Sequence, residues 1–150
     1  MTSVKHIPDG YHTITPYLLL NDVANYIEFL KRAFNAKEEH RSTGPDGKVA
    51  HAAVQIGNSM VMMGEARAEW PPTPSMLYMY VDDVDDVYSR AVDAGATSLQ
   101  APADQFYGDR NAGVKDIAGN SWWIATHIED VHPEELERRF KAARSQKAGD

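Results

Sequence analysis

The segment Tyr17-Leu-Leu-Leu-Asn-Asp-Val23 recurs along the chain as Tyr78-Met-Tyr-Val-Asp-Asp-Val84. In each copy an apolar stretch led by tyrosine runs into aspartate and valine, a pattern typical of a buried strand that ends at a helix cap. Each copy continues into a helical pattern of similar length, which ends at Asn35-Ala36 or at Gly95-Ala96. The sequence therefore predicts two strand–helix units of the same design.

A second match lies further along each half. Gly57-Asn58-Ser59 recurs as Gly119-Asn120-Ser121, and each triplet opens the last strand pattern of its half. Because both the strand-to-helix junction and the last hairpin recur at nearly the same separation, we expect an internal duplication. Each half is predicted to follow the order β-α-β-β-β.

The predicted fold class is α+β, with two tandem βαβββ modules and a C-terminal helix in one domain over residues 1–150. Module one is expected at about 10–65, a proline-rich linker at about 66–75, module two at about 76–127 and the C-terminal helix at about 133–145. Strands are expected at 12–20, 37–43, 49–56, 59–65, 76–81, 97–103, 107–115 and 121–127. Asn21 or Asp22 is expected to cap the first helix, and Asp82 or Asp83 the second.

The amino-acid composition excludes several classes of function for this chain. The chain has 150 residues, of which 43% are hydrophobic and 25% charged, as in an ordinary globular domain. A net charge of −7 with scattered acids disfavours nucleic acid and anionic membrane as partners. The absence of cysteine excludes disulfides and thiolate metal sites. No signal peptide or membrane span is recognisable, so we expect a soluble, cytoplasmic protein.

Several motifs are similar to those of one known family. They are Ile7-Pro-Asp-Gly-Tyr-His-Thr-Ile-Thr-Pro-Tyr17, Gly108-Asp-Arg110, Val114-Lys-Asp116 and Gly119-Asn-Ser-Trp-Trp-Ile-Ala-Thr-His127. With the two βαβββ units, they resemble the PhnB-like branch of the vicinal oxygen chelate superfamily, which includes glyoxalase I, the bleomycin-resistance proteins and the extradiol dioxygenases. The resemblance covers about residues 5–145. It implies a curved eight-stranded sheet around a cleft, and a homodimer.

The resemblance also implies metal-ligand positions on the first and last strands of each module. In this sequence those positions fall at Thr15, at Val61 or Met62, at Met76 and at Trp123. Divalent metals prefer imidazole and carboxylate ligands, which none of these side chains provides. The sequence therefore predicts that the family's metal site is lost and that the protein has no metal cofactor.

A displaced divalent metal site is an alternative. Glu65 shares a strand face with Val61, and His127 shares one with Trp123, so both could lie near the cleft rim. They could bind a metal there, or they could be rim residues without such a role. His51 could line the cleft or contact solvent.

The predicted ligand-binding residues are those expected to face the cleft. Aromatic rings offer stacking surfaces and methionines adapt to irregular shapes, although the same side chains could instead fill the barrel as core. Arg110 could clamp an anionic group, or pair with Asp109 or Asp116. The full set is Thr15, Tyr17, Met62, Met76, Tyr78, Tyr80, Arg110 and Trp123.

The favoured interpretation is a metal-free protein, similar to the bleomycin-resistance proteins, that binds a small, partly aromatic molecule in an apolar cleft. One alternative is a metal-dependent lyase or dioxygenase of the glyoxalase type that uses Glu65 and His127. Others are a metal-free enzyme with tyrosine or histidine as acid or base, and a partner-binding module with a filled cleft. Whether the protein is an enzyme is left open at this point.

Overall fold

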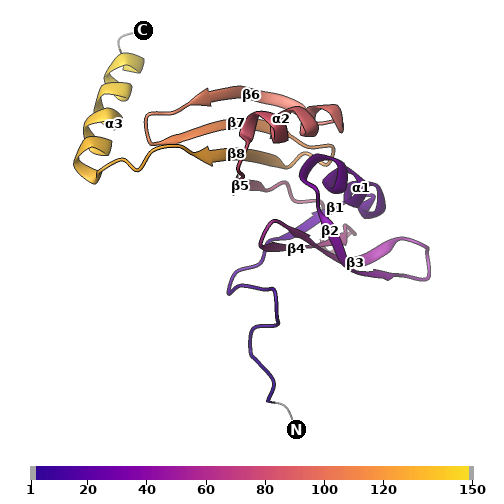
Figure 1. The fold of residues 1–150 in the computed structure, drawn as a ribbon. Helices are drawn as coiled ribbons and strands as arrows, with labels where there is room; N and C mark the ends of the chain where they lie inside the picture. The colour runs from indigo at the N-terminus through magenta and orange to yellow at the C-terminus, as the bar shows by residue number, and fades with distance from the viewer. Residues whose placement is uncertain (1–2, 149–150) are drawn as a thin grey trace.

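The structure is a computed structural model that describes residues 3–148. Over these residues the chain forms eight strands and three helices in the predicted order (Figure 1). Their bounds are β1 Tyr17–Leu20, α1 Val23–Phe34, β2 Lys37–Thr43, β3 Val49–Ile56, β4 Ser59–Glu65, β5 Met76–Tyr80, α2 Val84–Asp93, β6 Thr97–Asp104, β7 Asp109–Lys115, β8 Ser121–His127 and α3 Pro133–Ala148. The α+β class and both βαβββ modules are thus confirmed.

The eight strands are divided between two four-stranded sheets of identical topology. The first has the order β1-β4-β3-β2 and the second the order β5-β8-β7-β6. In each sheet the first and last strands of the module are parallel neighbours, and the other pairs are antiparallel. The outer edge of β1 forms a bridge from Leu19 to Thr73 of the linker. This contact occupies part of the free edge of β1. If the two sheets formed one continuous sheet through β1, this edge would have to pair with a strand of the other sheet.

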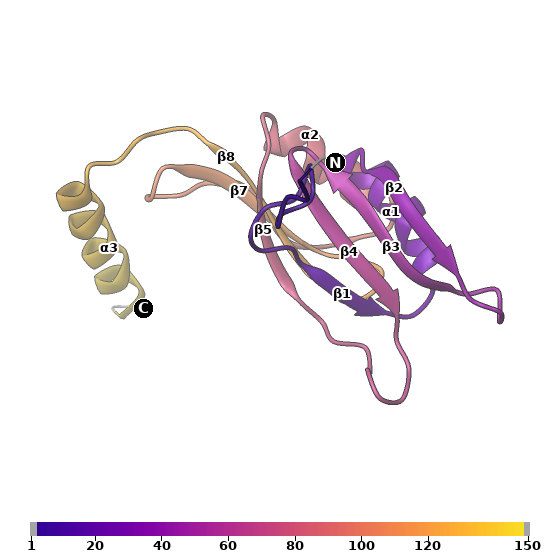
Figure 2. The same ribbon diagram turned by 90° about the horizontal axis from the view of Figure 1, so that it is seen from below.

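Each sheet has a face covered by helices and an open face, and this difference follows from strand alternation. In the first sheet Leu18, Leu20 and Met63 are fully buried on the covered face. The helix α1 supplies the matching apolar stripe, which includes Val23, Ile27, Leu30 and Phe34. Figure 2 shows α1 behind β2, β3 and β4, so the opposite surface of this sheet is free to form a site.

The start of the first strand differs from the prediction. The expected strand over 12–20 is regular only from Tyr17 to Leu20, because Pro16 has no N–H and Thr15 lies before the ladder. Asp22 adopts a left-handed conformation (φ 62°) and its side chain does not cap α1. The predicted left-handed end at Asn35 is confirmed (φ 56°), as is the cap of α2 by Asp83, which accepts from the N–H of Asp86.

The two last hairpins have turns of different length. Ile56 pairs directly with Ser59, so residues 57–58 form the whole first turn. Lys115 pairs with Ser121, which leaves residues 116–120 in the second. Equivalent residues of the first and last strands of the modules are 61 positions apart, as for the pairs Tyr17↔Met62 and Tyr78↔Trp123, whereas those of β3 and β7 are 60 apart. The Gly-Asn-Ser triplets are 62 apart, so they do not occupy equivalent places.

The helix α3 stands apart from both sheets at the far end of β8 (Figures 1 and 2). Arg139 holds it by donating to both carboxylate oxygens of Glu129, at 2.8 and 3.0 Å, and to the carbonyl of Phe106 at 3.0 Å. Among residues 3–148, none of the helices has the length and apolar character required to span a membrane.

Candidate functional site

The family's metal-ligand positions lie on the open faces of the two sheets. With an offset of 61, the residue equivalent to Trp123 is Met62, while Val61 is buried on the covered face. Met76 precedes Tyr78 by two residues on β5 and is 70% exposed. Thr15 takes the corresponding place before β1, outside the strand.

A divalent metal does not fit this set of side chains. Thr15, Met62, Met76 and Trp123 provide one neutral hydroxyl, two thioethers and an indole, and none of these is a good ligand for a hard cation. Within the described residues 3–148, no three His, Asp or Glu side chains form a group that could hold a metal ion.

The carboxylate of Glu65 binds the start of α1. Its two carboxylate oxygens accept from the backbone N–H groups of Asp22 at 2.8 Å and Val23 at 3.1 Å. In module two the same place is taken by Thr126, whose hydroxyl oxygen accepts from the N–H of Val84 at 3.0 Å. The residue equivalent to Glu65 is therefore Thr126 and not His127. The side chains of Glu65 and His127 also belong to different sheets.

The imidazole of His127, at the end of β8, lies between two carboxylates. Its Nδ1 contacts Asp109 at 2.9 Å and its Nε2 contacts Asp130 at 2.7 Å. These hydrogen bonds raise the pKa of the His127 imidazole above its usual value. Both ring nitrogens are engaged, so the imidazole has no free lone pair with which to act as a base.

Asp109 is the centre of a polar cluster on the open face of the second sheet. The carboxylate is only 4% exposed and accepts from the hydroxyls of Tyr78 at 2.7 Å and Tyr80 at 3.0 Å. Burial opposes its ionisation, but hydrogen bonds from His127 and the two tyrosines outweigh burial and lower the pKa of Asp109. Burial and the bond to Asp109 raise the pKa of Tyr78, so both tyrosines stay protonated.

The same face carries a flat aromatic surface. The Trp123 ring lies against Gly113, where a Cβ atom would come within 2.9 Å of the ring. Tyr78 and Tyr80 lie beside one another with ring centroids 5.4 Å apart, and they are 46% and 63% exposed. The predicted ligand-binding residues of module two, apart from Arg110, are thus brought together on this face.

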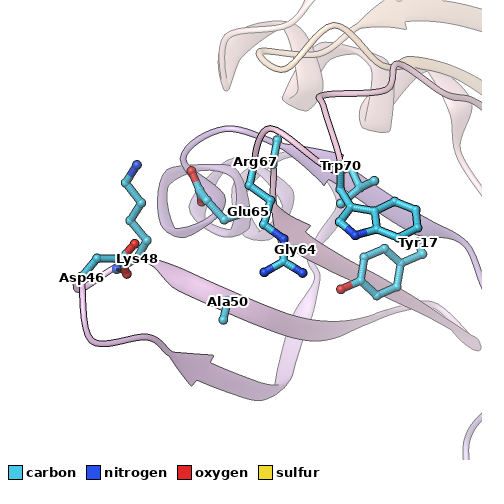
Figure 3. A pocket seen from close by; sticks show the side chains of 10 residues that line it. Tyr17, Asp46, Lys48, Ala50, Gly64, Glu65, Arg67 and Trp70 are labelled. Atoms are coloured by element: carbon cyan, nitrogen blue, oxygen red, sulfur yellow. Dashed lines mark hydrogen bonds between the residues drawn. The ribbon is translucent and has the colours of Figure 1, made fainter.

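The open face of the first sheet contains a cavity of about 810 Å³. Its aromatic side is formed by Tyr17 and Trp70, and its floor by Ala50 and Gly64 (Figure 3). Tyr17 shares a hydrogen bond of 3.2 Å with Nδ1 of His51, which places His51 on the open face. The cavity is lined by Tyr17, Leu19, Asp46, Lys48, Ala50, Gly64, Glu65, Ala66, Arg67 and Trp70.

A second, groove-like cavity of about 960 Å³ lies between the modules. Thr15 lines it together with Tyr78 and Tyr80, so the structure brings these three predicted residues together. Met62, Met76 and Trp123 lie outside both cavities.

Arg110 takes part in a different arrangement from either one considered for it. Its guanidinium donates to Asp85 of α2 at 3.0 and 3.2 Å and to Asp104 of β6 at 3.1 Å. Because it alternates with Asp109 and Asn111 along β7, it points to the face opposite the Asp109 cluster. An anion at the cleft has no direct route to this guanidinium.

Sequence reasoning missed the wall of the first cavity. Lys48, Arg67 and Trp70 lie in the turn before β3 and in the segment read as a linker. The available signal was a tryptophan between an arginine and three prolines, since an aromatic side chain in a stiff loop is a common binding element. The roles of Asp109 and Asn111 were missed because the β7 strand was only weakly patterned.

The chain was compared with known proteins. The model of the Glyoxalase/Bleomycin resistance protein/Dioxygenase superfamily matches residues 10–124. An uncharacterized protein of Mycobacterium bovis is 35% identical over 135 residues, which cover 83% of this chain and 89% of the relative. A Mycobacterium tuberculosis protein has the same identity, with 79% of its length covered.

Solved structures agree with this assignment at the level of the fold. The TM-score is 0.67 to TioX from Micromonospora sp. ML1, with 24% identity over 78% of this chain and 99% of that one. It is 0.65 to a glyoxalase/bleomycin resistance protein/dioxygenase family enzyme from Burkholderia phytofirmans, with 20% identity over 76% and 97%. The PhnB-like branch stays a prediction. The family match over most of the chain establishes that this protein belongs to the glyoxalase/bleomycin resistance protein/dioxygenase superfamily.

Proposed function

We propose that the protein binds a small, partly aromatic molecule in the cavity of the first sheet, without the help of a divalent metal. The observation that carries the proposal is the pair Tyr17 and Trp70, which are 48% and 58% exposed beside one cavity of about 810 Å³. Exposed aromatic rings at a concave surface are typical of ligand sites, because they bury a large apolar area with little loss of side-chain entropy.

The donor set supports a metal-free mode of binding. The four family positions offer no carboxylate or imidazole, and both oxygens of Glu65 are engaged by α1. A metal-dependent lyase or dioxygenase at Glu65 and His127 would have to break the cap of α1 and the contacts of His127 with two aspartates. We therefore do not favour the displaced metal site.

We also propose that the protein is a homodimer in which a second copy covers the open face of the second sheet. Met76, Tyr78 and Tyr80 leave an apolar and aromatic strip at the surface of β5. Large exposed apolar patches are uncommon on monomers. Native mass spectrometry should give twice the chain mass of 16.7 kDa. A purely monomeric species at micromolar concentration would contradict this proposal.

Binding can be tested with 2-naphthamide, a flat neutral probe, by isothermal titration calorimetry. We expect Trp70→Ala to weaken binding by about tenfold, since stacking on one ring contributes on the order of 1–1.5 kcal/mol. The matched control is Phe140→Ala, which removes an exposed ring on α3 and should leave binding unchanged. Treatment with EDTA should have no effect.

Two results would refute the proposal. One is the absence of binding by 2-naphthamide and by related flat aromatic compounds. The other is a stoichiometric divalent metal in the purified protein whose removal abolishes binding.

A further inference from the structure

We infer that the ligand of the first-sheet cavity is an aromatic anion, held by its ring at Tyr17 and Trp70 and by its charged group at Arg67. This inference rests on the proposed function and adds the chemical class of the ligand. Among the charged side chains around the cavity, the basic ones are more free to meet a ligand than the acidic ones.

The two acidic side chains of the cavity wall are engaged with backbone N–H groups. Glu65 accepts from Asp22 and Val23 at the start of α1. Asp46 accepts from the N–H of Lys48 at 3.0 Å, within the turn between β2 and β3. Both oxygens of Glu65 are engaged, so Glu65 could not bind a cationic ligand without losing a structural hydrogen bond, whereas Asp46 uses only one of its oxygens.

The two basic side chains of the cavity wall have fewer close partners than the acidic side chains. The nearest partner of Arg67 is Glu69, at 3.7 Å, and the side chains are 71% and 74% exposed. Exposed pairs of this kind contribute little. Lys48 makes no ion pair with any other residue of the described chain. The cavity lining carries two carboxylates and two cations, and the cations are the groups with fewer partners, although the whole protein carries −7.

Arg67 and Trp70 are held on the same side of the loop. Each backbone N–H donates to the carbonyl of the other residue at 2.9 Å, so the two form an antiparallel bridge. Residues directly opposite one another in such a bridge project to the same side. In Figure 3 the guanidinium of Arg67 lies in front of Gly64, between Lys48 on one side and the Tyr17 and Trp70 rings on the other.

This loop is fastened to the edge of the sheet at both ends. The N–H of Ala66 donates to the carbonyl of Leu20 at 2.9 Å, and that of Thr73 donates to the carbonyl of Leu19 at 3.1 Å. The backbone positions that carry the cation and the indole are thus fixed, which lowers the backbone entropy lost on binding.

Gly64 lets the Tyr17 side chain lie close against the floor of the cavity. A Cβ at Gly64 would lie 2.7 Å from the hydroxyl of Tyr17 and 3.0 Å from the carbonyl of Ala50, so a larger residue would displace the Tyr17 ring. A planar molecule would therefore stack on the exposed Tyr17 and Trp70 rings and not on Gly64 itself. A guanidinium presents paired donors to a carboxylate, and this combination selects an aromatic acid over its neutral or cationic analogue.

The test compares three probes of one shape: 2-naphthoate, 2-naphthamide and 2-naphthylmethylammonium. We expect 2-naphthoate to bind about tenfold more tightly than the amide, because a charge-assisted hydrogen bond exceeds a neutral one by roughly that factor. The ammonium should bind most weakly. The preference for the acid should shrink as salt is added, since the site is open to solvent.

The variant Arg67→Gln should weaken the binding of 2-naphthoate more than that of 2-naphthamide, so that the preference for the acid is lost. The matched control is Lys37→Gln, which removes an exposed cation of β2 outside the cavity and should change neither affinity. Equal binding of acid and amide by the native protein, preference for the ammonium, or an unaltered preference in Arg67→Gln would overturn the inference. In those cases binding of the amide would leave the proposed function standing, whereas failure of all three probes would overturn both.

Discussion

Tyr26, in the helix of the first module, donates a 2.5 Å hydrogen bond to Asp116, in the last turn of the second module. The same carboxylate accepts from Nε1 of Trp122 at 2.8 Å and from the backbone N–H groups of Ala118 and Asn120. Burial, followed by the charge of Asp116, raises the pKa of Tyr26, so the phenol stays a donor at any physiological pH. The two modules are joined by this buried network.

Replacing the carboxylate should therefore destabilise the whole protein. We expect Asp116→Asn to cost about 2–4 kcal/mol of unfolding free energy, because one buried amide cannot accept from all the donors that face it. Urea unfolding followed by circular dichroism measures this loss. Asp9→Asn, at an exposed pair with Lys5, is the control and should cost less than about 0.5 kcal/mol. Similar losses in both variants would contradict the structural account.

Glu65 should matter for stability rather than for metal content. Glu65→Ala removes two acceptors at the start of α1 and should cost about 1–2 kcal/mol, as for other helix caps. Glu65→Gln keeps one oxygen and should cost less. Thr126→Val makes the corresponding change at α2 and serves as the matched comparison. If Glu65→Gln instead lowered bound metal without changing stability, a metal-ligand role would be indicated.

His127 should make stability depend on pH. Hydrogen bonds to Asp109 and Asp130 raise the folded pKa of this imidazole above 6.5. A group with a raised folded pKa contributes its full stabilisation below the unfolded pKa and loses it as pH rises through the folded value. The free energy of unfolding should thus fall between about pH 6.5 and the folded pKa in the native protein, but not in His127→Gln. An imidazole midpoint below 6.5 by NMR titration would disprove this.

The helix α3 should be detachable without unfolding the sheets. Arg139→Ala removes the contacts with Glu129 and Phe106 that hold it. We expect faster hydrogen exchange along α3 and an almost unchanged urea midpoint for the core, since the lost contacts lie outside it. Arg138→Ala, which affects only a pair with Glu135, should leave exchange in α3 nearly as slow as before. Equal exchange in both variants would contradict an anchoring role.

Much of the fold could be predicted from the sequence because strand and helix periodicities are local. The Tyr17 and Tyr78 segments identified both modules, and Asn35 and Asp83 behave as their residue types suggest. The left-handed Asp22 was not foreseen, because Glu65, which replaces its capping role, is distant in sequence. Tertiary contacts here overrode a local preference.

The candidate site was less predictable than the fold. Strand alternation correctly grouped Tyr78, Tyr80 and Trp123, since faces follow from parity. The cavity at Arg67 and Trp70 depends on how the linker folds back onto β1, and composition alone carries no such information. Arg110 was expected to face the cleft, but its position on β7 places it on the opposite face, where it pairs with Asp85 of α2.

The difference in length between the two hairpin turns has a consequence for how the protein unfolds. Residues 116–120 hold the carboxylate that receives Tyr26, whereas the turn at residues 57–58 is too short to offer an equivalent. The asymmetry between the repeats thus adds a polar link to the apolar core that the two modules share. A chain cut at the linker would separate Tyr26 from Asp116, so neither half would possess a complete core of its own.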